Sequence, residues 1–148
     1  MKTPVMISKK KCVCLIFFLA YIAVVLRLTV FRFNFIFDER KLNLMIFSDL
    51  IDVYRNWGIN RFLWLFLGNI GWFIPFGFLV PMLLKKERFL IIIILGFLFS
   101  VTIESLQFIF RVGVAELDDL ILNTIGAAIG YMFYKFAYKI LSPSWRIT

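Results

Sequence analysis

The chain has 148 residues, of which 62% are hydrophobic and 19% aromatic, and its mean hydropathy is +0.91. Soluble globular domains are about 45–50% apolar, so this composition excludes an ordinary soluble domain. The length allows one domain, residues 1–148. The net charge is +8, but in a membrane protein basic residues gather at span ends beside anionic head groups. We therefore expect membrane lipid, and no nucleic acid, as the partner of these charges.

The side-chain inventory excludes several classes of site. The sequence has no histidine, which removes His-dependent catalysis and His-bearing zinc sites. The two cysteines, Cys12 and Cys14, are too few for a structural zinc site and too close together for a disulfide framework. We expect no resident metal and no cofactor.

Four apolar stretches predict four transmembrane helices, because about 20 helical residues cross the ~30 Å hydrocarbon core of a bilayer. The first stretch follows a run of lysines at 9–11, but it is too long for a typical signal peptide and has no A-x-A cleavage site. The predicted spans are residues 12–31, 62–84, 89–110 and 120–141. They predict an all-α fold, an integral membrane four-helix bundle.

The basic residues predict the orientation of the bundle, because lysine and arginine near span ends are retained in the cytoplasm. Ten lie on the side of the N-terminus: Lys2, Lys9, Lys10, Lys11, Lys85, Lys86, Arg88, Lys135, Lys139 and Arg146. Six lie on the other side: Arg32, Arg40, Lys41, Arg55, Arg61 and Arg111. We predict a multi-pass protein of the cytoplasmic membrane with both termini in the cytoplasm.

The outer segment between the first two spans, residues 32–61, retains apolar side chains among its charges. From Leu44 to Trp57 the apolar positions recur at helical spacing, with Asp49, Asp52 and Arg55 roughly opposite. This pattern predicts an amphipathic helix in the plane of the membrane interface. The helix is either a lid over the bundle or a connector that rests on lipid.

Polar side chains lie within the predicted spans, where a charge at the helix centre costs about 2.5–3.5 kcal/mol and usually faces inward. In the third span, Glu104, Gln107 and Arg111 are spaced to share one helical face, as are Asp119 and Asn123 in the fourth. Together with one residue of the second span they make the predicted ligand-binding set: Asn69, Glu104, Gln107, Arg111, Asp119 and Asn123.

The predicted orientation brings this set together in the outer half of the bundle. There the guanidinium groups of Arg111 and Arg27 are suitable partners for the carboxylates. They are also suited to hold an anionic group of a ligand. The set is either a structural network that ties the helices together or a pocket for a polar head group.

Small residues and prolines predict close helix packing. Gly126 and Gly130 form a G-x-x-x-G pattern, which lets a neighbouring helix approach closely. Pro75 and Gly77 interrupt the second span, where a proline removes a backbone hydrogen bond and usually kinks the helix.

Three motifs on successive spans carry a family resemblance. They are N-x-x-x-F-x-P-F-G from Asn69 to Gly77, E-x-x-Q-x-x-x-R from Glu104 to Arg111, and D-x-x-x-N-x-x-G from Asp119 to Gly126. In this order they resemble the VanZ-like family over essentially the whole chain. Residues 43–47 resemble the family's N-L-x-P-F element, with Ile46 in place of proline. The resemblance implies a bacterial membrane protein associated with resistance to glycopeptide antibiotics, especially the lipid-bearing teicoplanin.

Three functions remain open from the sequence. In the first, the outer pocket binds a lipoglycopeptide, a lipid-linked wall precursor or a lipid head group, and so changes the access of the antibiotic to its target. In the second, the chain is an enzyme acting on a lipid-anchored substrate, with Glu104 or Asp119 as general base, or with carboxylates and an asparagine holding Mg²⁺ or Ca²⁺. We favour a non-enzymatic role, because no activated nucleophile and no cofactor motif is present. In the third, the chain is a small transporter, which would need to form a homo-oligomer through Gly126 and Gly130, or an accessory subunit that stabilises a larger complex.

Overall fold

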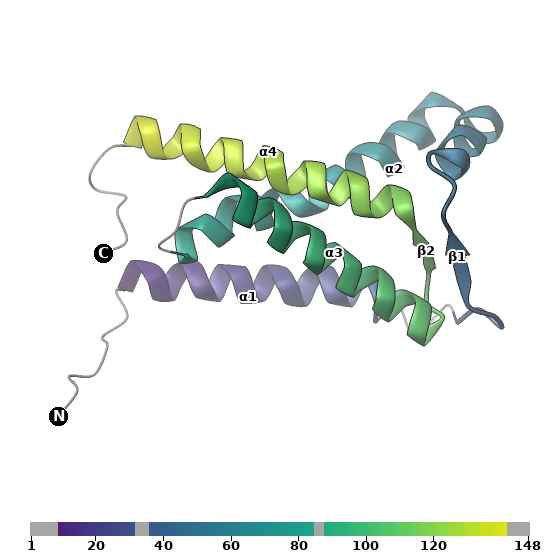
Figure 1. Ribbon diagram of the computed structural model, residues 1–148, viewed down its shortest axis with the longest axis horizontal. Helices are drawn as coiled ribbons and strands as arrows, with labels where there is room; N and C mark the ends of the chain where they lie inside the picture. Colours follow the sequence, from purple (N-terminus) through teal and green to yellow (C-terminus); the bar gives the residue numbers. More distant parts are fainter. Residues whose placement is uncertain (1–8, 32–35, 85–87, 142–148) are drawn as a thin grey trace.

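Apolar runs of this length form helices that satisfy their own backbone hydrogen bonds, as lipid requires. The computed structural model describes residues 9–31, 36–84 and 88–141 and contains four helices in those ranges, α1 (Lys9–Thr29), α2 (Ser48–Leu83), α3 (Phe89–Phe110) and α4 (Leu117–Leu141) (Figure 1). Each is long and apolar enough to cross a membrane. The prediction of an all-α four-helix membrane bundle is confirmed.

The helices pack around a core that all four share. Val25 of α1, Phe73 of α2, Ile92 of α3 and Ala127 of α4 are almost fully buried in it. The outward faces stay apolar and exposed, with only 11% to 39% of the most apolar window of each helix buried. Apolar side chains therefore fill the core of the bundle and also cover its outward faces. Outward faces of this kind are expected where lipid, and not water, surrounds the helices.

Glycines set the contact between α2 and α4, which is the most extensive in the bundle. A methyl group added at Gly126 would lie 2.2 Å from the carbonyl oxygen of Ile70, and one at Gly130 would lie 2.1 Å from that of Ile74. From the other helix, a methyl group at Gly77 would lie 1.9 Å from the carbonyl oxygen of Ala127. The surface that the sequence offers for self-association through Gly126 and Gly130 is therefore occupied within the chain.

The break in α2 lies at a glycine and not at a proline. Gly58 has φ 77° and ψ 178°, whereas the backbone stays helical at Pro75 and Pro81. The kink that the sequence predicts at Pro75 stays a prediction, since a proline can bend a helix that keeps helical φ and ψ values. Glycine adopts a positive φ without a steric cost, so the chain turns at Gly58 between a helix of residues 48–57 and the span that follows it.

Two short strands close one end of the bundle, and the sequence does not predict them. β1 (Lys41–Asn43) pairs in parallel with β2 (Val114–Glu116), and Asn43 lies opposite Glu116. Figure 1 shows both strands at the end where α3 finishes and α4 starts, which we name the strand end. The distribution of basic residues predicts that the strand end lies outside the cell. Five of those residues, Lys2, Arg32, Lys85, Lys86 and Arg146, lie outside the described residues.

The helix predicted in the outer segment is present but begins at Ser48, four residues later than the apolar pattern indicates. Leu50 is buried, whereas Met45, Tyr54 and Trp57 are exposed by 72%, 53% and 76%. A lid closed over the bundle would bury these side chains. Their exposure favours the second interpretation, a connector that rests on lipid.

Candidate functional site

Polar side chains from three spans meet β2 at the strand end. The side-chain amide of Asn69 on α2 donates a hydrogen bond to the carboxylate of Asp119 on α4. Glu104 on α3 is 6% exposed, and its Oε2 accepts a hydrogen bond of 3.0 Å from the backbone N–H of Glu116 in β2. We name Asn69, Glu104, Glu116 and Asp119 the acidic cluster. The sequence predicts that Asn69, Glu104 and Asp119 lie close together, as they do, but it does not single out Glu116.

The acidic cluster brings carboxyl groups close to one another. The charged groups that act on Glu104 are the carboxylates of Asp119 and Glu116. Among the described residues, the charged groups that act on Glu104, Glu116 and Asp119 are carboxylates and include no lysine or arginine. Arg111, the partner predicted on α3, donates to the carbonyl oxygen of Asp38 and not to these carboxylates. Burial and the repulsion between neighbouring carboxylates disfavour their charged forms, so such a group of carboxylates binds either a proton or a cation.

The pKa of Glu116, which lies outside the spans, reports this environment. Burial first, and then the negative charges of Asp119, Asp49 and Asp118, raise the pKa of Glu116 from 4.5 to about 7. Its carboxyl group therefore changes charge near neutral pH, inside a cluster that faces the strand end.

Glu116→Gln tests this shift through stability. Between about pH 4.5 and pH 7 the folded chain keeps a proton that the unfolded chain has lost, so stability falls as pH rises through this window and levels off above it. We expect the variant to exceed the wild type by about 1 kcal/mol at pH 8, since partial exposure screens the repulsion, and to match it at pH 4. Melting temperatures of the detergent-purified protein across this range measure the difference. A difference that does not change with pH contradicts the assignment.

Arg111 lies outside the acidic cluster, although helical spacing predicts it beside Glu104. The last residue of α3 is Phe110, and Arg111 adopts the left-handed conformation (φ 57°) as its C-cap. Its guanidinium donates a hydrogen bond of 2.9 Å to the carbonyl oxygen of Asp38. Arg27, the second predicted partner, donates to the carbonyl oxygen of Phe31.

Gln107 and Asn123 are buried and tie helices together. The side-chain amide of Gln107 donates to the carbonyl oxygen of Thr29 at 3.3 Å, which joins α3 to the end of α1. The side-chain amide of Asn123 donates to the hydroxyl oxygen of Ser100 at 2.9 Å, which joins α4 to α3. These two members of the predicted set act as structural ties beside the acidic cluster.

Asp118 is a further buried acidic residue that periodicity does not single out. It is 2% exposed, and its Oδ1 accepts a hydrogen bond of 2.8 Å from the backbone N–H of Phe47. This bond links the start of α2 to the start of α4, where the helix dipole favours a carboxylate. The sequence feature that could have identified Asp118 is its position in the first turn of a helix that follows a loop.

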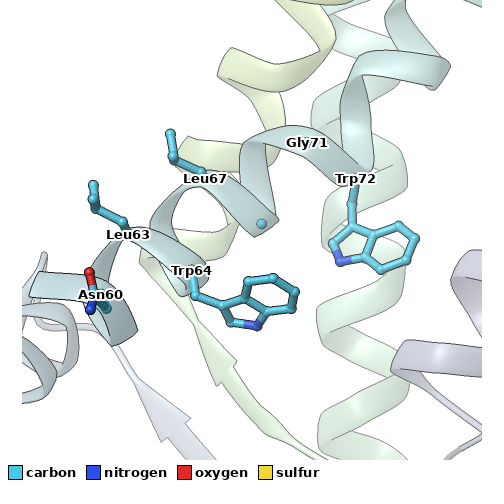
Figure 2. A pocket seen from close by; sticks show the side chains of 7 residues that line it. Asn60, Leu63, Trp64, Leu67, Gly71 and Trp72 are labelled. Atoms are coloured by element: carbon cyan, nitrogen blue, oxygen red, sulfur yellow. The ribbon is translucent and has the colours of Figure 1, made fainter. Parts of the chain in front are cut away.

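A separate hollow of about 640 Å³ lies on an exposed face of α2 (Figure 2). Its lining consists of Asn60, Leu63, Trp64, Leu67, Gly68, Gly71 and Trp72. Figure 2 shows Leu63 and Leu67 pointing to one side and the two tryptophans to the other. A methyl group added at Gly71 would meet nothing within 4 Å. None of the predicted site residues lines this hollow, so we place the candidate site in the acidic cluster.

The acidic cluster does not have the arrangement of a metal centre. Within the described ranges, no group of three or more histidine, cysteine or acidic side chains is placed to hold a metal ion. The amide of Asn69 and the backbone N–H of Glu116 are hydrogen-bond donors and already occupy oxygens that a metal would need.

Comparison with known proteins identifies the family. A sequence model of VanZ/LLP1 matches residues 18–138, which include all of α2 and α3, most of α4 and the second half of α1. The chain belongs to the VanZ/LLP1 family. Protein VanZ of Enterococcus faecium is 36% identical over 73 residues, which make up 49% of this chain and 45% of that relative. The chain thus aligns with about half the length of this relative, and no solved structure matches it. The resemblance predicted from the three motifs is confirmed.

Proposed function

We propose that this VanZ-family protein contributes to resistance against glycopeptide antibiotics of the teicoplanin type, and that the acidic cluster binds a ligand at the outer face of the bacterial membrane. The family match and the four membrane-spanning helices support the first part. The observation that carries the second is the convergence of Glu104, Glu116 and Asp119 where α2, α3, α4 and β2 meet.

The chemistry of the cluster favours a cationic group of the ligand. The sequence predicts an anionic ligand because it places Arg111 in the pocket, but the guanidinium of Arg111 binds the Asp38 carbonyl instead. Buried carboxylates without a basic partner attract an ammonium group strongly, since the surroundings screen little. The protein then lowers antibiotic access by holding an amine-bearing lipoglycopeptide or a lipid-linked wall precursor at the membrane surface.

A susceptibility assay tests this function. We expect a teicoplanin-susceptible Gram-positive host that expresses the wild-type chain to tolerate more teicoplanin than the host with empty vector, with a smaller effect for vancomycin. Membrane abundance is checked by immunoblot in both strains. No protection from an abundant, membrane-inserted chain contradicts the proposed resistance function and leaves the fold and family unaffected.

One observation also favours an enzymatic alternative. The pKa of Glu116 lies near 7, as a general acid or base requires at neutral pH. In this alternative the cluster transfers a proton on a lipid-anchored substrate of the cell envelope. Product formed from labelled lipid-linked wall precursors by the purified protein, and abolished in Glu116→Gln, would replace binding with catalysis as the function.

A further inference from the structure

A second hollow lies at the strand end, and the described residues that line it are all charged. It has a volume of about 400 Å³ and is bordered by Asp38, Glu39, Arg40 and Arg111. It adjoins the C-terminal end of α3, where Arg111 is the C-cap. None of its four side chains belongs to the acidic cluster, so this hollow is a separate feature of the molecule.

Both arginines are held in place by contacts that leave guanidinium donors free. The backbone N–H of Arg111 donates to the carbonyl oxygens of Gln107 and Phe108, and its Nη1 donates to the carbonyl oxygen of Asp38. The guanidinium carbon of Arg40 lies 5.9 Å from the centroid of the Phe108 ring, a cation–π contact. Each guanidinium has five N–H donors, so most of them remain available to a ligand.

The four charges do not neutralise one another in pairs. The lining has two carboxylates and two guanidiniums, yet among the described residues no ion pair joins any two of them. Because the guanidinium and carboxylate groups are not paired with one another, each can contact the opposite charge of a zwitterionic ligand. A guanidinium pair matches a phosphate or carboxylate group, and the carboxylates match an ammonium group.

We infer that this hollow binds the zwitterionic head group of a membrane lipid that carries a phosphate and a primary ammonium, as in phosphatidylethanolamine. Arg40 and Arg111 hold the phosphate, and Asp38 and Glu39 accept hydrogen bonds from the ammonium. A lipid is favoured over a soluble zwitterion by the neighbouring surface: Ile109 and Phe110 are 55% and 51% exposed on the last turn of α3, where the alkyl chains of that lipid would lie.

Native mass spectrometry of the full chain in detergent tests this site with three lipids of matched chain length. We expect phosphatidylethanolamine to bind about tenfold more tightly than phosphatidylcholine, whose trimethylated amine has no N–H donor, or phosphatidylglycerol, which has no cation. Arg40→Gln and Arg111→Asn should abolish the preference, since asparagine tolerates the left-handed backbone at position 111. Arg61→Gln, an exposed arginine of α2 away from the hollow, is the matched control and should keep it.

Three outcomes overturn the inference. Equal binding of phosphatidylethanolamine and phosphatidylcholine shows that the ammonium is not recognised. Tighter binding of phosphatidylglycerol shows an anion site instead. Full competition by free phosphoethanolamine at the concentration of the lipid shows that the source is a soluble compound. Unchanged melting temperatures of the two arginine variants confirm that a lost preference reflects binding and not unfolding.

Discussion

Gly126→Ala is expected to destabilise the bundle by about 1–3 kcal/mol, the typical cost of overpacking a tight contact. The new methyl group would lie 2.2 Å from the carbonyl oxygen of Ile70, so α4 and α2 must separate to admit it. Because this contact is the most extensive between any two helices, the separation affects the whole fold. Thermal unfolding of the detergent-purified protein measures the loss.

Gly71→Ala is the matched control for this prediction. It introduces the same methyl group into a helix of the same chain, but at a position with nothing within 4 Å. We expect its stability to equal or exceed that of the wild type by up to about 1 kcal/mol, because alanine favours a helix over glycine. Equal melting temperatures for Gly126→Ala and the wild type would contradict the assigned α2–α4 contact.

Glu104→Gln is expected to remove most of the protection against teicoplanin while the protein remains abundant in the membrane. Glutamine keeps an oxygen that accepts the hydrogen bond from the backbone N–H of Glu116, so the local fold is retained. It removes the negative charge that a cationic ligand group would meet. The loss of one charge-assisted contact corresponds to a reduction in affinity of about 10–100-fold.

The control for Glu104→Gln is Asp52→Asn, which neutralises an exposed carboxylate of α2 outside the acidic cluster. This variant should protect as the wild type does, because a solvated charge contributes little to a site elsewhere. Growth inhibition by teicoplanin is compared at equal membrane levels, determined by immunoblot. Full protection by Glu104→Gln would exclude the acidic cluster as the binding site.

The spans were predictable because length and apolarity decide whether a helix crosses a membrane, whatever its neighbours are. The start of α2 was not predictable from the apolar pattern, because a local hydrogen bond to a side chain holds the preceding residues in a turn. The carbonyl oxygen of the Asn43 side chain accepts a hydrogen bond of 2.9 Å from the backbone N–H of Met45, which holds a turn. Phe47 then has φ 57°, so a regular helix cannot begin before Ser48.

The acidic cluster was predictable in part. Asn69, Glu104 and Asp119 face one another because helical spacing and the alternation of span directions hold throughout their helices. Arg111 was misplaced because this spacing ends with the helix at Phe110, and the left-handed cap then turns its side chain toward Asp38. Glu116 was missed because it comes to Glu104 through a three-residue strand whose partner, β1, is about 70 residues away in sequence.

The most direct test of the proposed site is the binding of one amine-bearing lipoglycopeptide, and of the same compound with its amine acetylated, to the wild-type protein in lipid nanodiscs. Acetylation removes the positive charge and leaves the rest of the ligand unchanged. We predict that the free amine form binds at least about tenfold more tightly than the acetylated form, and that Glu104→Gln binds the two forms equally. Equal binding of both forms by the wild type would contradict the claim that the acidic cluster holds a cationic group.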